Sequence, residues 1–264
     1  GEVYKLLRDS FQKADKELME TPTFQVAQDG STAIVTLLTG STPPLEGARG
    51  DLKIYVANAG DCRAVLCRGG KAERVSEDHK PERADEIQRI KDAGGEVLSI
   101  RGTWRVTTIA GAAAAVKEQG MEDHEYLAVA RAFGDEALKK PLPLVISTPE
   151  IQVVDIEEED CFLVVACDGI WDVLSDQEVV QIAGDFFGNP RDAASSIAGL
   201  ATRKGSADNL TVTVVEFGWI SGDYCKRMMD KNKAGDEGDA GGGGDDDDDD
   251  GFGRTDRGSD GFGR

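Results

Sequence analysis

The sequence predicts an α+β fold in which two β-sheets pack as a sandwich and helices flank them. Strand-like apolar runs come first, in an order typical of meandering antiparallel strands. Helical patterns then fall in pairs between later strands, instead of alternating with single strands as in repeating βαβ folds. Hydrophobic residues make up 39% of the 264 residues, which is enough to bury the core of one large domain.

The first half of the chain supplies one helix, a set of strands and a second helix. Apolar residues at helical spacing predict a helix over residues 1–20. Gly94-Gly95 ends the second helix, because glycine readily adopts the backbone conformation that closes a helix. In order, the expected elements are a helix at 1–20, a strand at 31–38, a loop at 40–51, a strand at 53–59, a hairpin of 64–67 with 73–76, and a helix at 82–93.

The second half is expected to close the sandwich and add a pair of helices. Ser175 followed by Glu178 is a capping-box pattern, which predicts a helix from 175 to 187. Pro190 marks the start of the next helix, at 191–203. Residues 102–126 are ambiguous, with an Ala-rich run that fits a short helix in an insertion. The expected strands are 153–155, 162–166 and 210–217.

Charge separates the chain into a domain and a tail. From Ala234 to the end there are eleven acidic and three basic residues, a net charge of −8 out of −20 for the chain. Such a segment has little apolar surface to bury, so we expect a folded domain at 1–219 and a disordered Gly/Asp-rich tail at 220–264. The acidic balance argues against nucleic acid or an anionic membrane as the main partner. No apolar run approaches the twenty residues of a membrane-spanning helix.

The five cysteines contain no Cys-x-x-Cys pair and are odd in number. Cys161 and Cys167 lie six residues apart on one predicted strand, where they are expected to face the same side and not to bridge. The pattern is typical of the reduced thiols of an intracellular protein.

Four aspartates beside predicted strand ends are the candidate functional residues. Asp168 and Asp172 follow the buried run Phe162–Ala166, Asp61 follows the strand at 53–59, and Asp208 precedes the last strand. Carboxylates gathered in this way favour a hard cation such as Mg²⁺ or Mn²⁺. The competing interpretations are a turn role for Asp61 and helix capping for Asp168 and Asp172.

Taken together, the motifs resemble the catalytic domain of the metal-dependent type-2C serine/threonine protein phosphatases (PPM family). Among them are Asn58-Ala59-Gly60-Asp61 and Ala166-Cys167-Asp168-Gly169-Ile170-Trp171-Asp172. The resemblance covers roughly residues 1–218. In family order, the matching segments are 29–33, 57–64, 77–81, 89–95, 127–135, 148–150, 166–172 and 206–211.

The resemblance implies hydrolysis of phosphoserine and phosphothreonine in protein substrates by a metal-activated water. By position, Asp168 and Asp208 match ligands of the second of two Mg²⁺ or Mn²⁺ ions. Asp61 and Asp172 match positions associated with a third, weaker ion or with its waters. A monomer located in the cytoplasm, the nucleus or both is expected, with no nucleic-acid or membrane partner.

The family also carries upstream motifs that the printed sequence does not contain. These are a phosphate-binding Arg and an Asp-Gly-His-Gly-Gly stretch that supplies a bridging metal ligand and the general-acid His. We therefore expect an N-terminally truncated domain that lacks some central strands, has no catalytic acid of its own and shows little or no activity. His79 and His124 match neither motif. The alternative is a pseudophosphatase or binding module that docks a partner without catalysis.

Overall fold

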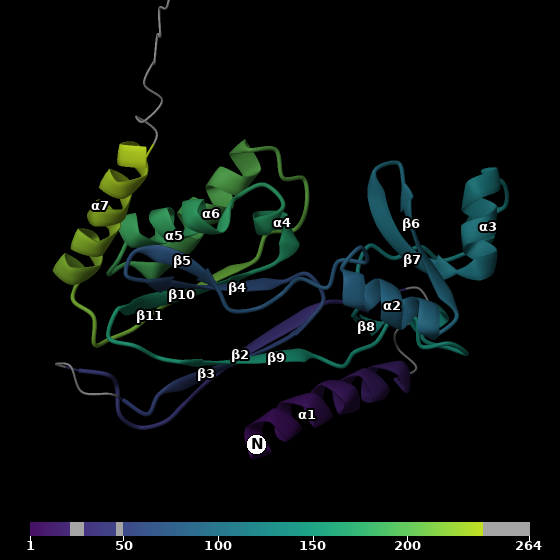
Figure 1. Cartoon of the computed structure of the whole chain (residues 1–264), viewed down its shortest axis with the longest axis horizontal. Helices are drawn as coiled ribbons and strands as arrows, with labels where there is room; N and C mark the ends of the chain where they lie inside the picture. Colours follow the sequence, from purple (N-terminus) through teal and green to yellow (C-terminus); the bar gives the residue numbers. More distant parts are fainter. Residues whose placement is uncertain (22–28, 46–49, 240–264) are drawn as a thin grey trace, which may run out of the picture.

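The computed structural model describes residues 1–21, 29–45 and 50–239, with side chains up to 232. Two antiparallel sheets lie face to face, with one helix outside the first and several outside the second (Figure 1). A smaller lobe of strands and helices stands beside these layers. The expected α+β sandwich flanked by helices is confirmed.

The three-stranded sheet has the order β2-β3-β9 and is covered by the first helix. Leu7 and Phe11 of this helix are buried against Ala57 and Ala59 of the central strand. The bounds are α1 Glu2–Met19, β2 Ala33–Thr39, β3 Lys53–Ala59 and β9 Glu150–Asp155.

The four-stranded sheet has the order β11-β10-β4-β5, and every pair in it is antiparallel. Helices cover the face turned away from the other sheet (Figure 1). The strands are β4 Arg63–Arg68, β5 Lys71–Arg74, β10 Asp160–Ala166 and β11 Val212–Glu216. The helices are α4 Asp168–Trp171, α5 Asp176–Asp185, α6 Pro190–Arg203 and α7 Gly222–Asp239.

Two apolar cores hold these layers together. Between the sheets, Ile54 and Val56 of β3 meet Leu66 and Leu163 of the opposite sheet. Between the four-stranded sheet and its helices, the largest fully buried side chain is Phe162. Strand β10 therefore contributes to both cores, because its successive side chains point to opposite faces.

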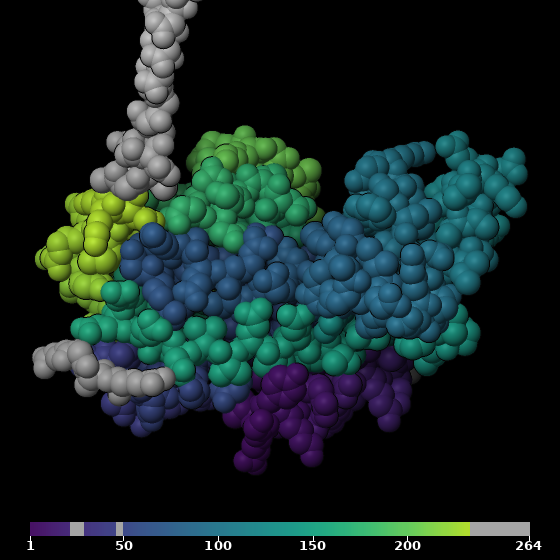
Figure 2. Space-filling view, in the orientation of Figure 1, coloured from purple at the N-terminus to yellow at the C-terminus, as the bar shows by residue number. Residues whose placement is uncertain are grey.

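The side lobe comprises a hairpin and the helices beside it. Figure 2 shows a hollow between this lobe and the helical layer, and α4 lies at the margin of that layer facing the lobe (Figure 1). The bounds are β1 Gly30–Ser31, α2 Ala84–Asp92, β6 Gly95–Ile100, β7 Thr103–Thr108, α3 Ile109–Lys117, η1 Met121–Asp123, β8 Phe133–Gly134 and η2 Glu136–Leu138. The Ala-rich run of the ambiguous segment lies in α3, as predicted.

The boundary between domain and tail differs from the prediction. Residues 222–239 form α7, and its Cys225 and Met229 are buried in the core beneath the helices. These two side chains lie one helical turn apart and therefore share a face, which anchors the helix to the core. The expected disorder from residue 220 is thus wrong for the start of the tail. Residues 240–264 lie outside the described residues, as do 46–49 of the predicted loop.

No helix in the described part of the chain is long and apolar enough to cross a membrane.

Candidate metal centre

Asp168 lies where the buried strand β10 passes into α4. Its carboxylate Oδ1 accepts the Gly169 N–H at 2.9 Å, so it partly satisfies the start of this one-turn helix. Burial raises the pKa of the Asp168 carboxyl above its usual value, and the negative charges of Asp61 and Asp208 raise it further. Asp172 contributes in the same direction, so the other three predicted carboxylates all lie close enough to act on Asp168.

Asp208 reaches this place because its loop packs directly on Gly169. A Cβ added at Gly169 would lie 2.5 Å from the Asn209 carbonyl O and 3.3 Å from Asp208 Cβ, so any larger residue would push the loop away. Ser206 Oγ donates to the Gly169 carbonyl O at 2.7 Å. Cys167 adds a second attachment, since its Sγ accepts the Thr211 N–H at 3.2 Å. Asp208 itself is exposed.

Asp61 is held in a tight turn after β3. Gly60 has a φ of +124°, and a Cβ there would lie 2.2 Å from the Thr32 side chain. Asn58 Nδ2 lies 2.9 to 3.0 Å from the carbonyl oxygens of Gly60, Cys62 and Glu77, which fixes the turn. Asp61 is only 4% exposed. The turn role and the proximity to Asp168 are therefore both observed for Asp61.

Lys80 supplies the positive charge in this group of carboxylates. Its Nζ lies 2.6 Å from Asp61 Oδ2 and 3.8 Å from Asp172 Oδ1. Burial opposes the charged form, but the hydrogen bond and charge of Asp61 hold the pKa of the ammonium above its usual value. Sequence reasoning missed this lysine, although it lies in the Glu77–Pro81 motif.

Asp172 ends α4 and is largely exposed. It does not cap the next helix, because Ser175 does so through a complete capping box with Glu178. Helix capping of α5 therefore does not explain Asp172, and its ion pair with Lys80 directs it toward the other carboxylates.

The chemistry of these donors suits a hard divalent cation, since all are carboxylates and one ammonium is already bound among them. Within the described residues, however, no three His, Cys, Asp or Glu side chains converge closely enough to form a ligand shell. The carboxylates would have to turn toward a common point, and Lys80 would have to move aside. The donor set fits the ion, in an arrangement whose negative charge Lys80 neutralises only in part.

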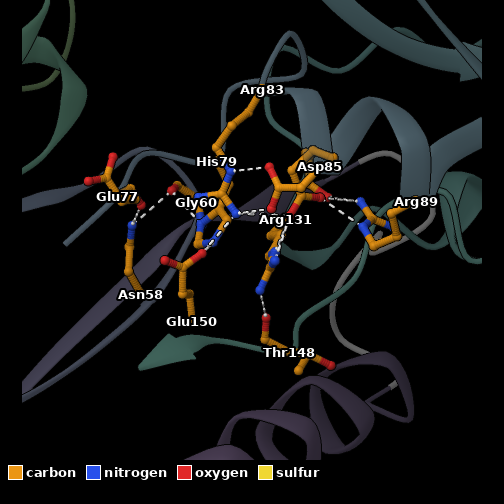
Figure 3. Close-up of polar contacts among 12 residues, drawn as sticks. Asn58, Gly60, Glu77, His79, Arg83, Asp85, Arg89, Arg131, Thr148 and Glu150 are labelled. Carbon is orange, nitrogen blue, oxygen red and sulfur yellow. Dashed lines mark hydrogen bonds and ion pairs between the residues drawn. The ribbon is translucent and has the colours of Figure 1, made fainter. Parts of the chain in front are cut away.

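A second polar cluster joins the sandwich to α2 (Figure 3). His79 is fully buried, with Nδ1 3.0 Å from the Gly60 carbonyl O and Nε2 3.5 Å from Glu150 Oε2. Burial, reinforced by Arg131 and Arg83, lowers the pKa of His79 to about 4, so its ring is neutral at physiological pH. His79 thus has a structural environment, as the sequence suggested.

Glu86 is the centre of the same cluster and is 1% exposed. Arg131 Nε donates to its Oε1 at 2.7 Å, and Arg89 Nε donates to its Oε2 at 2.7 Å. Arg131 also donates to the Thr148 carbonyl O at 2.9 Å (Figure 3). One buried carboxylate therefore connects α2 with the segments on either side of β8, which positions the lobe beside the metal centre.

The carboxyl of Asp135 should make the free energy of unfolding of this protein depend measurably on pH. Burial raises the pKa of its carboxyl to about 6, although nearby Lys139 opposes the rise. Between about pH 4 and pH 6 the folded state then binds more protons than the unfolded state, so this group lowers the free energy of unfolding as the pH rises. At about 1.4 kcal/mol per unit, the loss is on the order of 3 kcal/mol.

Asp135→Asn should abolish that contribution, since asparagine does not titrate and tolerates the left-handed backbone found at this position (φ 50°). Urea unfolding at pH 4 and pH 7 measures it. The variant should be more stable than the parent at pH 7 and equal to it below pH 4. If variant and parent differ equally in free energy of unfolding at both pH values, the raised pKa of Asp135 is contradicted.

The chain is similar to known phosphatases over most of its length. The family model described as Protein phosphatase 2C matches residues 1–210. Probable protein phosphatase 2C 71 of Arabidopsis thaliana is 38% identical over 211 residues, which cover 80% of this chain and 40% of the relative. Probable protein phosphatase 2C 59 of the same plant is 39% identical over 211 residues, covering 80% of this chain and 57% of the relative. The chain spans about half the length of these curated relatives.

Solved structures share the fold. A serine-threonine phosphatase 2C from Toxoplasma gondii aligns with a TM-score of 0.67 at 23% identity, over 81% of this chain and 67% of that one. A sex determining protein from C. elegans aligns with a TM-score of 0.65 at 23% identity, over 84% of this chain and 48% of that one.

Proposed function

Because the chain belongs to the protein phosphatase 2C family, we propose that its carboxylates serve Mg²⁺- or Mn²⁺-dependent hydrolysis of phosphoserine and phosphothreonine in proteins. The observation that carries this proposal is the ammonium of Lys80 bound between Asp61 and Asp172, beside Asp168. A site that neutralises four carboxylates with one lysine has negative charge left for a divalent ion.

In this proposal Asp168 and Asp208 hold one of two ions. Asp61 and Asp172 hold a third, weaker ion or orient its waters. Bound ions would supply an activated water and neutralise phosphoryl oxygens. The chain's own groups keep the carboxylates close together: Gly169 lets the Asp208 loop approach, and Asn58 fixes the turn of Asp61.

On its own, the 264-residue chain is proposed to bind the cation without turning over substrate. Its sequence has neither the Asp-Gly-His-Gly-Gly stretch nor the upstream Arg of the family. The alternative is a pseudophosphatase that keeps the fold to dock a partner.

The test is Mn²⁺-dependent phosphate release from a phosphothreonine peptide. The 264-residue chain should release no more phosphate than its Asp168→Ala variant. The same chain, extended at its N-terminus by a family segment that carries Asp-Gly-His-Gly-Gly, should be active and should lose activity with Asp168→Ala. An extended chain that folds and binds Mn²⁺ but stays inactive would favour the pseudophosphatase.

Replacing Lys80 with methionine should strengthen Mn²⁺ binding by about tenfold, because it removes a cation that competes for Asp61 and Asp172. The variant should also be less stable without metal, since the buried Asp61 loses its counter-ion. Calorimetric titration and thermal unfolding with and without Mn²⁺ measure both effects. Lys91→Met, on the exposed face of α2, is the matched control. Unchanged or weaker Mn²⁺ binding in Lys80→Met would refute the proposal that Lys80 competes with the cation for these carboxylates.

We also propose phosphorylated proteins as the substrates of a monomer in the cytoplasm, the nucleus or both. The formal net charge of −20 for the whole sequence supports the absence of a nucleic-acid or anionic-membrane partner. A rice relative at 38% identity is named mitochondrial, which is a statement about that protein.

A further inference from the structure

Cys62 and Cys167 each stand next to a carboxylate of the candidate metal centre. Cys62 follows Asp61, and Cys167 precedes Asp168. We propose that these two cysteines form an intramolecular disulfide when the protein is oxidised, and that this disulfide weakens divalent-cation binding at the adjoining carboxylates. The disulfide itself is independent of the proposed phosphatase activity.

The strand register brings the two cysteines opposite each other. Strands β4 and β10 are antiparallel, and their last partners are Arg63 and Ala166. One step further along the same register pairs Cys62 with Cys167.

The backbone hydrogen bonds show that Cys62 and Cys167 are a non-hydrogen-bonded pair of the antiparallel strands. The Cys167 N–H donates to the Thr211 carbonyl O, on the side of β11. In an antiparallel sheet the N–H and C=O of one residue point to the same neighbour, so Cys167 makes no backbone hydrogen bond toward Cys62. Such pairs bring Cα atoms to about 4.5 Å, which lies within the range that a disulfide spans.

Both thiols also point to the same face of the sheet. Along β4, Ala64 and Leu66 face the other sheet, so Cys62 does too, and its Sγ lies 3.3 Å from Thr32 Oγ1. Along β10, Leu163 and Val165 face the other sheet, and Cys167 continues that alternation.

Cys161 does not share that face with Cys167, contrary to the expectation from spacing. The register of β10 shifts between Asp160 and Phe162, and this irregularity leaves both Cys161 and Phe162 in the core beneath the helices. The sequence also predicted that Cys161 and Cys167 do not bridge. The structure agrees, but the reason is that the two side chains lie on different faces of the sheet.

Access distinguishes the proposed pair from the other cysteines. Cys62 and Cys167 are partly exposed, whereas Cys67, Cys161 and Cys225 are fully buried. A small peroxide dissolved in water therefore reaches the pair first.

The proposed oxidant is hydrogen peroxide. One thiol attacks a peroxide oxygen, the O–O bond breaks, and a sulfenic acid and one water form. The second sulfur then attacks the sulfenic sulfur, the S–O bond breaks, and a second water leaves. The two sulfurs lose two electrons in total, the peroxide gains them, and a dithiol restores both thiols by exchange.

Disulfide formation would release the loop that carries Asp208. In the thiol form, Cys167 Sγ accepts the Thr211 N–H and donates to the Asn209 carbonyl O, each at 3.2 Å. Turning Sγ toward Cys62 breaks both contacts. Losing such supporting contacts around a metal ligand typically lowers metal affinity by about 10- to 100-fold.

The test oxidises the full 264-residue chain with hydrogen peroxide, removes the peroxide by desalting and titrates Mn²⁺ calorimetrically. We expect a mass lower by two hydrogens, a cross-linked tryptic peptide containing residues 54–63, and Mn²⁺ binding at least about tenfold weaker. A dithiol followed by desalting should reverse all three changes.

Cys62→Ser should prevent the cross-link and keep Mn²⁺ binding after peroxide, and Cys167→Ser should likewise prevent the cross-link. Cys225→Ala should behave like the parent. A cross-link among the buried cysteines, or no intramolecular cross-link, would overturn the proposal. So would a Cys62–Cys167 cross-link that leaves Mn²⁺ affinity unchanged. If the reduced chain binds no Mn²⁺, the cation site fails separately and the mass still tests the disulfide.

Discussion

Glu86→Ala is expected to lower the free energy of unfolding by about 3 to 5 kcal/mol, as removal of one partner from a buried ion pair commonly does. The carboxylate is 1% exposed and contacts Arg131 and Arg89, with Arg83 3.5 Å away. Without it, guanidinium groups that are themselves mostly buried face one another with no counter-ion.

The loss cannot come from the helix itself, because alanine forms helices more readily than glutamate does. Urea unfolding followed by circular dichroism measures the change. Glu86→Gln should be intermediate, since it keeps the shape and one acceptor. Glu82→Ala, at an exposed position just before α2, should stay within about 0.5 kcal/mol of the parent. Equal stability of Glu86→Ala and the parent would show that the arginines do not depend on this carboxylate.

Much of the framework was predictable because local patterns specify it. The capping box of Ser175 and Glu178 predicted the start of α5, and the structure contains both hydrogen bonds. Strand β3 was predicted with its observed bounds, Lys53–Ala59, since a short apolar run bounded by turn residues is a strong strand signal. These elements depend on neighbours in sequence.

Elements that depend on distant partners were missed. Strand β6, Gly95–Ile100, is an exception, because it was missed although its partner β7 follows it directly in the sequence. Helix α7 was taken as part of the tail, because its two buried side chains gain a partner only once the core is present. In the sequence, Glu86 resembles an ordinary solvated charge in the first turn of a helix. Its burial could not be predicted, because its partner Arg131 lies 45 positions away.

The candidate site shows the same division. The motifs placed the four aspartates, and the structure gives three of them, Asp61, Asp208 and Asp172, as charged neighbours of Asp168. Lys80 was missed because its ion pairs with Asp61 and Asp172 join segments far apart in the chain. The pairing of Cys62 with Cys167 likewise needs the strand register.

Asp168→Ala is expected to have the largest effect on cation binding. The negative charges of the other three carboxylates all raise the pKa of Asp168, so all three lie near it. It is also more buried than Asp172 and Asp208, which water screens more strongly. Its removal should therefore abolish measurable Mn²⁺ binding, whereas Asp172→Ala should weaken it only in part.

Calorimetric titration of Mn²⁺ into the reduced chain, with Asp168→Ala in parallel, tests the central claim most directly. Asp9→Ala, an exposed carboxylate of α1, controls for nonspecific attraction to this acidic protein. Saturable binding by the parent and Asp9→Ala, absent in a folded Asp168→Ala, is the predicted result. No binding by the parent, or the same binding in Asp168→Ala, would contradict the assignment of a cation site to these carboxylates.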